Sequence, residues 1–223
     1  MSEISDILGV TIASPGYFEL ANEAAARFRK HSGLDALVIT TDRNDSYDMK
    51  YILPLLGTRT LVFFDADLWF IRQVSFARFA NLNGIAAVQD ATRHSLHGTF
   101  CLQDALGLDM PPDRYVNTGF MVINPRLPAV AEAFRLASAL MAQRRAGEVK
   151  TLDVTEQSLL NAAFHRSGVD MHFLPDEWNF WPMAWKHKFY DRLPMEPYCI
   201  HAAGVPLDQK AEFLEKHRLA FEP

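Results

Sequence analysis

Short apolar runs alternate along this chain with longer segments whose apolar residues recur every three or four positions. The short runs predict buried strands, and the period of the longer segments predicts amphipathic helices. Their order along the chain favours an α/β fold with a mostly parallel central sheet flanked by helices. We expect strands at 10–13, 36–40, 61–64, 85–90 and 120–124, helices after Ser14 and at 130–145 and 155–165, and loop with a short helix over 91–116.

The composition excludes several classes of protein. The 223 residues, 49% of them hydrophobic, suit one domain over 1–223, and no linker divides them. A formal net charge of -5 argues against non-specific nucleic-acid binding, which needs clustered Lys and Arg. Cys101 and Cys199 lack metal-type spacing, so we expect free thiols in a reducing compartment. No apolar run approaches the roughly 20 residues that span a bilayer, and residues 1–6 are no signal peptide. We therefore expect a cytoplasmic protein, with peripheral membrane contact left open.

The apolar run 61–64 ends in two carboxylates, Asp65 and Asp67, which are separated by Ala66. A run buried on both faces is typical of a parallel sheet, and open α/β sheets bind ligands at the carboxyl ends of such strands. Two acids this close repel each other unless a positive group lies between them. A divalent cation that carries a phosphate-bearing ligand fits this position. The alternative is a pair of loop carboxylates that cap a helix, since Asp favours caps.

Three further segments place polar side chains beside buried elements. Asn117-Thr118-Gly119 precedes an apolar strand, where glycine lets a ligand approach the backbone closely, although an ordinary turn is the alternative. Glu156-Gln157 opens a helix with Thr155 as its N-cap, near the positive end of the helix dipole, although helix-start chemistry alone would also explain the pair. His201 ends a short apolar run, with Gly204 three residues later, and is either a third metal ligand or a structural histidine.

Taken in order, these segments resemble the GT-A glycosyltransferases, and most closely the retaining group called family eight, with its glycogenin-like and bacterial galactosyltransferase-like members. The resemblance runs from residue 11 to residue 204. Beside the Asp-x-Asp, it rests on residues 11–17, on Arg59, Asn117-Thr118-Gly119, Glu156-Gln157, Leu174-Pro175-Asp176-Glu177-Trp178-Asn179 and 201–204. The chain departs from the family's pattern at Pro15, at Glu156, where Asp is commoner, and at Lys210, which lies later than expected.

The resemblance implies a metal-dependent glycosyltransferase that moves a hexose from a nucleotide-diphospho-sugar, most often a UDP-sugar, to a glycan, lipid-linked or small-molecule acceptor with retention of configuration. Residues 1–90 would form the donor-nucleotide half and 91–223 the acceptor half. Asp65, Asp67 and His201 would hold Mn²⁺ or Mg²⁺, and Gln157 and Glu156 would be the catalytic residues. Polysaccharide biosynthesis is the family's usual role in bacteria. The implied donor-binding residues are Thr11, Ala13, Tyr17, Asp42, Arg59, Ala66, Asp90, Asn117, Thr118, Gly119, Gly204 and Lys210.

Within this donor-binding set, the resemblance implies different roles. Tyr17 would stack on the base, or else face the core as an ordinary helix residue, and Asp42 would bind uracil or ribose. Arg59 and Lys210 would help to stabilise the departing diphosphate. Asn117 would bind the hydroxyls of the sugar.

Two other functions stay open. A sugar nucleotidyltransferase has a doubly wound sheet as well, but it typically carries a Gly-rich basic loop after the first strand, and Ser14-Pro15-Gly16-Tyr17 has no Lys or Arg. A catalytically inactive binding or scaffold protein of the same fold would be expected to lose metal ligands, whereas Asp65, Asp67 and His201 are all present. The aromatic residues between 175 and 198 could contact the acceptor or lie in the core.

Overall fold

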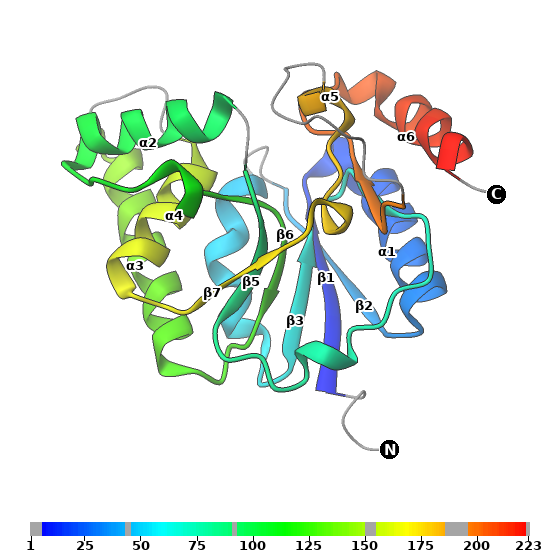
Figure 1. The fold of residues 1–223 in the computed structure, drawn as a ribbon, viewed down its shortest axis with the longest axis horizontal. Coiled ribbons are helices and arrows are strands. Elements are labelled where there is room, and N and C mark those ends of the chain that lie inside the picture. Colours follow the sequence, from blue (N-terminus) through cyan, green and yellow to red (C-terminus); the bar gives the residue numbers. More distant parts are fainter. Residues whose placement is uncertain (1–5, 43–45, 91–92, 150–154, 186–195, 222–223) are drawn as a thin grey trace.

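A six-stranded sheet lies at the centre of the protein, with helices against both of its faces (Figure 1). The structure is a computed structural model and describes residues 6–42, 46–90, 93–149, 155–185 and 196–221; the N-terminal segment and part of the aromatic stretch considered above lie outside these ranges. The strand order is β2 (Ala36–Thr40), β1 (Ile7–Ala13), β3 (Thr60–Phe64), β6 (Val116–Ile123), β5 (Ile85–Gln89) and β7 (Met171–Leu174). The described helices are α1 (Phe18–Ser32), α2 (Arg93–Leu106), α3 (Pro128–Arg145), α4 (Glu156–Ser167), α5 (Pro182–Trp185) and α6 (Leu207–Phe221).

The α/β fold with a mostly parallel sheet is confirmed, and four of its elements differ from expectation. The segment 91–116 contains the 14-residue helix α2, where we expected loop with a short helix. Cys101 and Leu102 give α2 a buried side. Strand β6 begins at Val116, so Asn117 and its neighbours lie inside the strand and not before it. Strand β7 and helix α6 were not predicted; the sides of β7 are only half-buried or exposed, which hides the usual apolar pattern.

Strand β6 runs antiparallel to its neighbours β3 and β5, whereas the other pairs of the sheet are parallel. The first residues of β6 therefore lie at the same edge of the sheet as the last residues of β3. The pairing of β6 with β5 shifts between Ala87, which faces Met121, and Val88, which faces Asn117. A shift of this kind bends a strand and re-aims its side chains. Residues 117–119 are thereby presented at the edge where β3 ends.

Alternate residues of β3 enter two different cores. Leu61 and Phe63 belong to the core that contains side chains of α3 and α4, whereas Val62 and Phe64 belong to the core that contains Phe28 of α1. These four side chains are all buried. This explains the uninterrupted apolar run, since a strand covered on both faces cannot alternate with polar residues.

A second, two-stranded sheet joins β4 (Leu68–Phe70) to β8 (Cys199–His201) in antiparallel register, with Leu68 opposite His201. Strand β4 directly follows Asp67, so this pairing brings His201 to the Asp-x-Asp turn. The ladder continues one residue further, because the N–H of Ala202 donates to the backbone carbonyl of Asp67 at 3.0 Å. The position of the histidine is therefore set by backbone hydrogen bonds.

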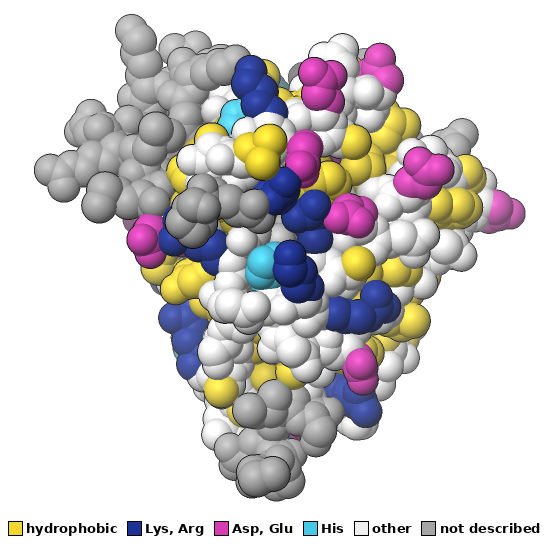
Figure 2. Space-filling view, turned by 90° about the vertical axis from the view of Figure 1, so that its right-hand side faces the viewer, with side chains coloured by type: hydrophobic (Ala, Val, Ile, Leu, Met, Phe, Trp, Pro, Cys, Tyr) yellow, Lys and Arg dark blue, Asp and Glu magenta, His cyan; other side chains and the backbone are white. Residues whose placement is uncertain are grey.

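Basic side chains gather across the middle of the surface seen in Figure 2, the side on which α1 and α6 lie in Figure 1. Acidic residues of the same helices accompany them. Arg27 of α1 pairs with Glu23 at 2.7 Å and lies 3.8 Å from Glu215 of α6, which also pairs with Arg218. Helices long and apolar enough to cross a membrane are absent from the part of the chain that the structure describes.

Candidate functional site

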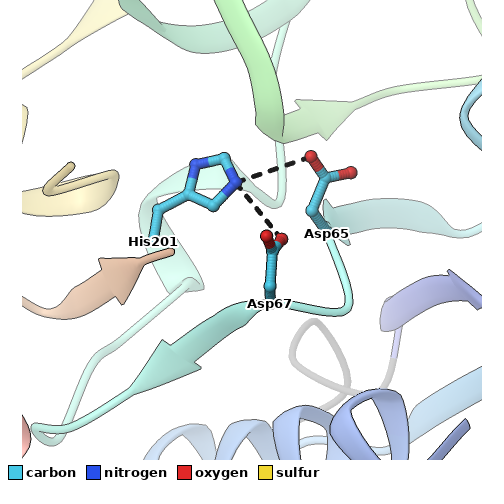
Figure 3. A group of neighbouring side chains, drawn as sticks. All are labelled: Asp65, Asp67 and His201. Atoms are coloured by element: carbon cyan, nitrogen blue, oxygen red, sulfur yellow. Dashed lines mark ion pairs between the residues drawn. The ribbon is translucent and has the colours of Figure 1, made fainter. Parts of the chain in front are cut away.

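Three side chains with metal-binding atoms meet where β3 ends (Figure 3). Asp65 and Asp67 come from the turn between β3 and β4, and His201 comes from the end of β8. Nε2 of His201 lies 3.6 Å from Oδ2 of Asp65 and 3.3 Å from Oδ1 of Asp67. One ligand atom from each residue lies within 4.8 Å of the other two. Two carboxylates and an imidazole suit a divalent cation, so these residues could hold one.

A chain of hydrogen bonds fixes the orientation of the His201 ring. The N–H of Gly119 donates to Oδ1 of Asn117 at 2.8 Å, and Nδ2 of Asn179 donates to the same oxygen at 2.8 Å. Because a backbone N–H can only donate, Asn117 presents its oxygen there and Asn179 presents its amide nitrogen. Oδ1 of Asn179 then accepts from Nδ1 of His201 at 3.0 Å. Nδ1 therefore carries a ring proton, and Nε2 faces the carboxylates as it does in a metal-ligating histidine.

Lys50 is a site residue that the sequence analysis did not identify. It lies in the 3₁₀ segment Ser46–Leu56, and its side chain is buried. Nζ lies 3.0 Å from Oδ1 of Asp65, and it donates to Oε1 of Glu156 and to the carbonyl of Thr118, both at 3.3 Å. The ammonium group therefore joins one of the candidate metal ligands to the first residue of α4.

The basic residue that we expected near the Asp-x-Asp, Arg59, lies elsewhere. It is exposed and precedes the first residue of β3, whereas Asp65 follows the last residue of the same strand. The length of the strand thus separates Arg59 from the candidate metal ligands Asp65, Asp67 and His201. The sequence signal for Lys50 was a single lysine in the otherwise apolar stretch 49–56, which lies far enough from the motif to be overlooked.

Lys210, which the resemblance singled out, contacts the second aspartate. Its Nζ donates to Oδ2 of Asp67 at 2.5 Å and to the carbonyl of Ala202 at 2.7 Å. The side chain comes from the first turns of α6 and is buried. Each aspartate of the cluster thus already holds one ammonium group, which is the charge that a cation would bring. A cation would have to share these carboxylates with the two ammonium groups.

Burial and charge shift the pKa values of the two aspartates in opposite directions. Burial raises the pKa of Asp65 by more than Lys50 and His201 lower it. Burial acts in the same sense on Asp67, but its contacts with His201 and Lys210 outweigh it and hold the pKa of Asp67 well below its usual range. Burial would lower the pKa of Lys50, yet the two carboxylates beside it raise that pKa above its ordinary value. Of the two aspartates, Asp67 is therefore the one more firmly kept ionised.

Gln157 of α4 is held at both ends of its amide. Its Oε1 accepts from the N–H of Thr118 at 3.1 Å, and its Nε2 donates to Oδ2 of Asp90 at 2.9 Å. Thr155 is the N-cap of α4 as expected, because its side chain accepts from the N–H of Ser158 at 3.3 Å. Asp90 is buried and follows β5. Residues from three separate elements, all expected to bind the donor or act in catalysis, are thus joined by direct hydrogen bonds.

Most of the side chains described above line one pocket of about 390 Å³, a size within the range that holds small ligands. The wall on the side of α2 includes His97, and the wall on the side of α5 includes Trp181. The indole N–H of Trp181 donates to the carbonyl of Ala203 at 2.7 Å, which holds the ring in place. Two other aromatic residues of the tail, Trp178 and Phe180, lie in the core. The predicted residues that line the pocket are Asp65, Asp67, Asp90, Asn117, Glu156, Gln157, His201, Gly204 and Lys210.

Of the other predicted donor-binding residues, Thr118 and Gly119 lie in β6. The rest, apart from Arg59, lie on β1, after β2 and beside the aspartates. Thr11 and Ala13 are buried in β1. Tyr17 and Ala66 line a small cavity next to the two aspartates. Asp42 follows β2 and is exposed. The structure therefore brings Tyr17 and Ala66 to the metal cluster and leaves Asp42 at the surface.

The fold, but not the sequence, is similar to that of known proteins. No protein-family model and no curated protein matches the chain. WbbM, a bifunctional glycosyltransferase, superposes with a TM-score of 0.62 over 98% of this chain and 52% of its own, at 16% identity. The chain has a glycosyltransferase fold. Mouse xyloside xylosyltransferase 1 matches with a TM-score of 0.59 over 90% of this chain and 99% of its own, at 10% identity.

GlyE, a glycosyltransferase of Streptococcus pneumoniae TIGR4, is likewise similar to this chain in fold and dissimilar in sequence. Its TM-score is 0.55 over 89% of this chain and 55% of its own, at 17% identity. The present chain thus spans about half the length of WbbM and of GlyE. At these identities the likeness concerns the fold, and it does not single out family eight among glycosyltransferases.

Proposed function

We propose that the protein is a metal-dependent glycosyltransferase of the GT-A type, similar to family eight, which transfers a hexose from a UDP-sugar to a glycan or other acceptor with retention of configuration. One observation carries the proposal: the candidate metal ligands and the fixed amide of Gln157 line one pocket at the strand ends of a glycosyltransferase fold. Mn²⁺ suits an oxygen-rich set with one imidazole, and Mg²⁺ is the alternative. Residues 1–90 would supply most of the nucleotide contacts and 91–223 most of the acceptor contacts.

The first chemical step is loss of the nucleoside diphosphate from the anomeric carbon. When bound, the metal supplies Lewis-acid stabilisation for the charge that collects on this leaving group. Lys50 and Lys210 add two fixed positive charges at the same place. Positive charge that is already in position when negative charge develops lowers the barrier, and burial strengthens its effect.

The sugar would lie against Gln157, Asp90 and Asn117. The amide of Gln157 is a poor nucleophile, and its two hydrogen bonds keep it fixed, so it suits the stabilisation of an oxocarbenium-like sugar. Glu156 is the neighbouring carboxylate that could act as a nucleophile or bind a sugar hydroxyl. Lys50 holds its Oε1 at 3.3 Å and so limits where that carboxylate can reach.

The test of this function is calorimetric titration of UDP into the protein with and without Mn²⁺, with GDP for comparison. We expect UDP to bind more tightly than GDP, and we expect the binding of UDP to require Mn²⁺. Asp65→Ala and Asp67→Ala should remove the metal-dependent part of the binding, whereas Asp109→Ala, a change at an exposed aspartate, should not. Failure of the folded protein to bind either nucleotide in the presence of Mn²⁺ would overturn the proposal in favour of an inactive scaffold.

A product assay separates the two possible enzymes. Incubation with a panel of UDP-sugars should release UDP as the donor is slowly hydrolysed in the absence of an acceptor. A sugar nucleotidyltransferase would instead release pyrophosphate from a nucleoside triphosphate and a sugar phosphate. Pyrophosphate release without UDP release would therefore refute the transferase assignment.

A further inference from the structure

The side-chain amide of Gln157 has two N–H groups, and the partner of the second one decides what the amide can offer to a sugar. A primary amide has two N–H donors and an oxygen that can accept twice. Oε1 of Gln157 accepts from the N–H of Thr118 at 3.1 Å, and Nε2 donates to Oδ2 of Asp90 at 2.9 Å. These two bonds use one N–H and one acceptor position. The other N–H and the other acceptor position carry opposite partial charges, so it matters which of them is engaged.

Tyr115, the residue before β6, places its hydroxyl beside this amide. Its side chain is buried, and Tyr115 and Gln157 line the same pocket. Burial raises the pKa of Tyr115 to about 12, and hydrogen bonding from Ser158 and Gln157 opposes this rise. A group that lowers the pKa of a phenol stabilises the phenolate, so Gln157 turns an N–H toward the Tyr115 oxygen. The hydroxyl of Tyr115 therefore engages the second N–H of the amide.

A row of hydroxyl groups holds Tyr115 in this position. Oη of Tyr115 lies 2.8 Å from Oγ of Ser158, which lies 3.3 Å from Oγ1 of the N-cap residue Thr155. Since Oη accepts from Gln157, its single proton is directed to Ser158. A Cβ atom added at Gly98 of α2 would lie 2.6 Å from Oη of Tyr115. A side chain at position 98 would therefore push the hydroxyl out of the row, and glycine leaves it in place.

We propose that Tyr115 is a positioning residue for Gln157 and makes its amide act as an acceptor. The hydroxyl engages the second N–H, so a lone pair of Oε1 is what the amide offers to the sugar. An oxygen lone pair attracts the positive charge of an oxocarbenium-like sugar, whereas a free N–H would repel it. This inference rests on the proposed function, to which it adds a residue that acts through Gln157 without contact with the reacting atoms.

The first test observes the Gln157 amide directly and needs no turnover. The side-chain NH₂ signals of isotope-labelled protein are assigned to Gln157 by their loss in Gln157→Ala, and the exchange of their protons with solvent is followed by NMR. We expect Tyr115→Phe to accelerate this exchange about tenfold or more, because one N–H loses its partner. Tyr198→Phe removes a hydroxyl from a ring that packs on Trp178 outside the pocket, and as the matched control it should exchange like the wild type.

The second test is a double-mutant cycle on the slow hydrolysis of a UDP-sugar. Tyr115→Phe should lower kcat about tenfold or more and leave KM and the affinity for UDP unchanged, because the hydroxyl acts on a side chain beside the reacting carbon. In a Gln157→Ala background the same change should have less than about a twofold effect, since the amide that it orients is gone. Ser158→Ala removes the acceptor of the Tyr115 proton, and it should change exchange and kcat in the same direction by a smaller factor.

Two results would overturn the role of Tyr115. The first is wild-type exchange of the Gln157 NH₂ group in a folded Tyr115→Phe protein. The second is an effect of Tyr115→Phe on kcat that is as large in Gln157→Ala as in the wild type. If Tyr115→Phe does not fold, Ser158→Ala decides both points, and wild-type exchange and kcat in that variant overturn the role. Failure of the proposed function looks different: the wild type would hydrolyse no UDP-sugar, while the faster exchange in Tyr115→Phe would persist.

Discussion

Replacing Gly119 by Ala should disable the metal site while leaving the sheet intact. A Cβ atom added at Gly119 would lie 2.3 Å from Cε1 of His201 and 2.9 Å from Oδ2 of Asp65, whereas ordinary contact begins at 3.4 Å. Position 119 lies in β6 and is not among the residues with positive φ, so alanine itself suits the backbone there. The histidine ring therefore has to move by about 1 Å to make room.

The expected loss of metal affinity follows from the narrow range of distances that a metal site allows between the ion and its ligands. Metal–ligand distances tolerate about 0.2 Å, so a displacement of this size takes His201 out of the ligand set. Changes in the groups that orient a ligand typically lower metal affinity by about 10- to 100-fold, and we expect a loss in that range. Overpacking should cost about 1–3 kcal/mol of stability, or several degrees in Tm for a chain of this length.

The assay is a Mn²⁺ titration in the presence of UDP, paired with thermal denaturation. Gly9→Ala is the matched control, because its added Cβ would lie 2.5 Å from Cε1 of Phe28, in the core beneath α1 and outside the metal cluster. This control should lower Tm to a similar extent and leave Mn²⁺ affinity unchanged. Wild-type Mn²⁺ affinity in Gly119→Ala, or an equal loss of affinity in Gly9→Ala, would refute the reasoning.

Three further predictions concern the groups around the pocket. Tyr115→Phe should change how the stability of the protein depends on pH in the alkaline range. Burial raises the pKa of Tyr115 to about 12. The folded chain therefore keeps a proton that the unfolded chain loses from pH 10 upward. Urea denaturation should show stability lost with rising pH in the wild type by up to about 2.7 kcal/mol more than in the variant, and equal slopes above pH 10 would contradict this. Asn161→Leu should lower the free energy of unfolding, measured by urea denaturation, by about 3 kcal/mol. In this buried position Oδ1 of Asn161 accepts from the N–H of Val116 and Nδ2 donates to the carbonyl of Val116, each at 2.8 Å. A loss below about 1 kcal/mol would mean that water replaces the amide. Gln157→Ala should lower UDP-sugar hydrolysis by about 100-fold or more while UDP affinity changes little, and unchanged turnover would remove Gln157 from the mechanism.

Much of the site could be predicted because it lies where strands end. The run 61–64 is apolar on every residue since both faces of β3 are covered, and its abrupt end at Asp65 marks the edge of the sheet. The same reasoning places Asp90 after β5 and His201 after a short apolar run. These positions depend on local patterns, which the sequence displays directly.

The parts that could not be predicted depend on the packing of distant segments. Lys50 reaches Asp65 from a 3₁₀ segment whose path is set by its contacts with the core, and no local period marks its direction. The start of β6 enters the site because that strand runs antiparallel and because its pairing with β5 shifts at Ala87. The link from His201 through Asn179 to Asn117 likewise joins side chains from three parts of the chain. Motif matching named all three residues for other reasons and gave no sign of the bonds between them.

The pairing of β4 with β8 also determines when the site can exist during synthesis. Leu68 faces His201 across the ladder, although roughly 130 residues separate them in the chain, a contact of high sequence separation that forms late. At a translation rate of about 5–20 residues per second, the aspartates leave the ribosome several seconds before the histidine. A nascent or truncated chain that lacks β8 has the Asp-x-Asp without its third ligand. Full loading of the proposed metal site would therefore be confined to chains whose synthesis has passed residue 201, and metal occupancy would report that β8 has paired with β4.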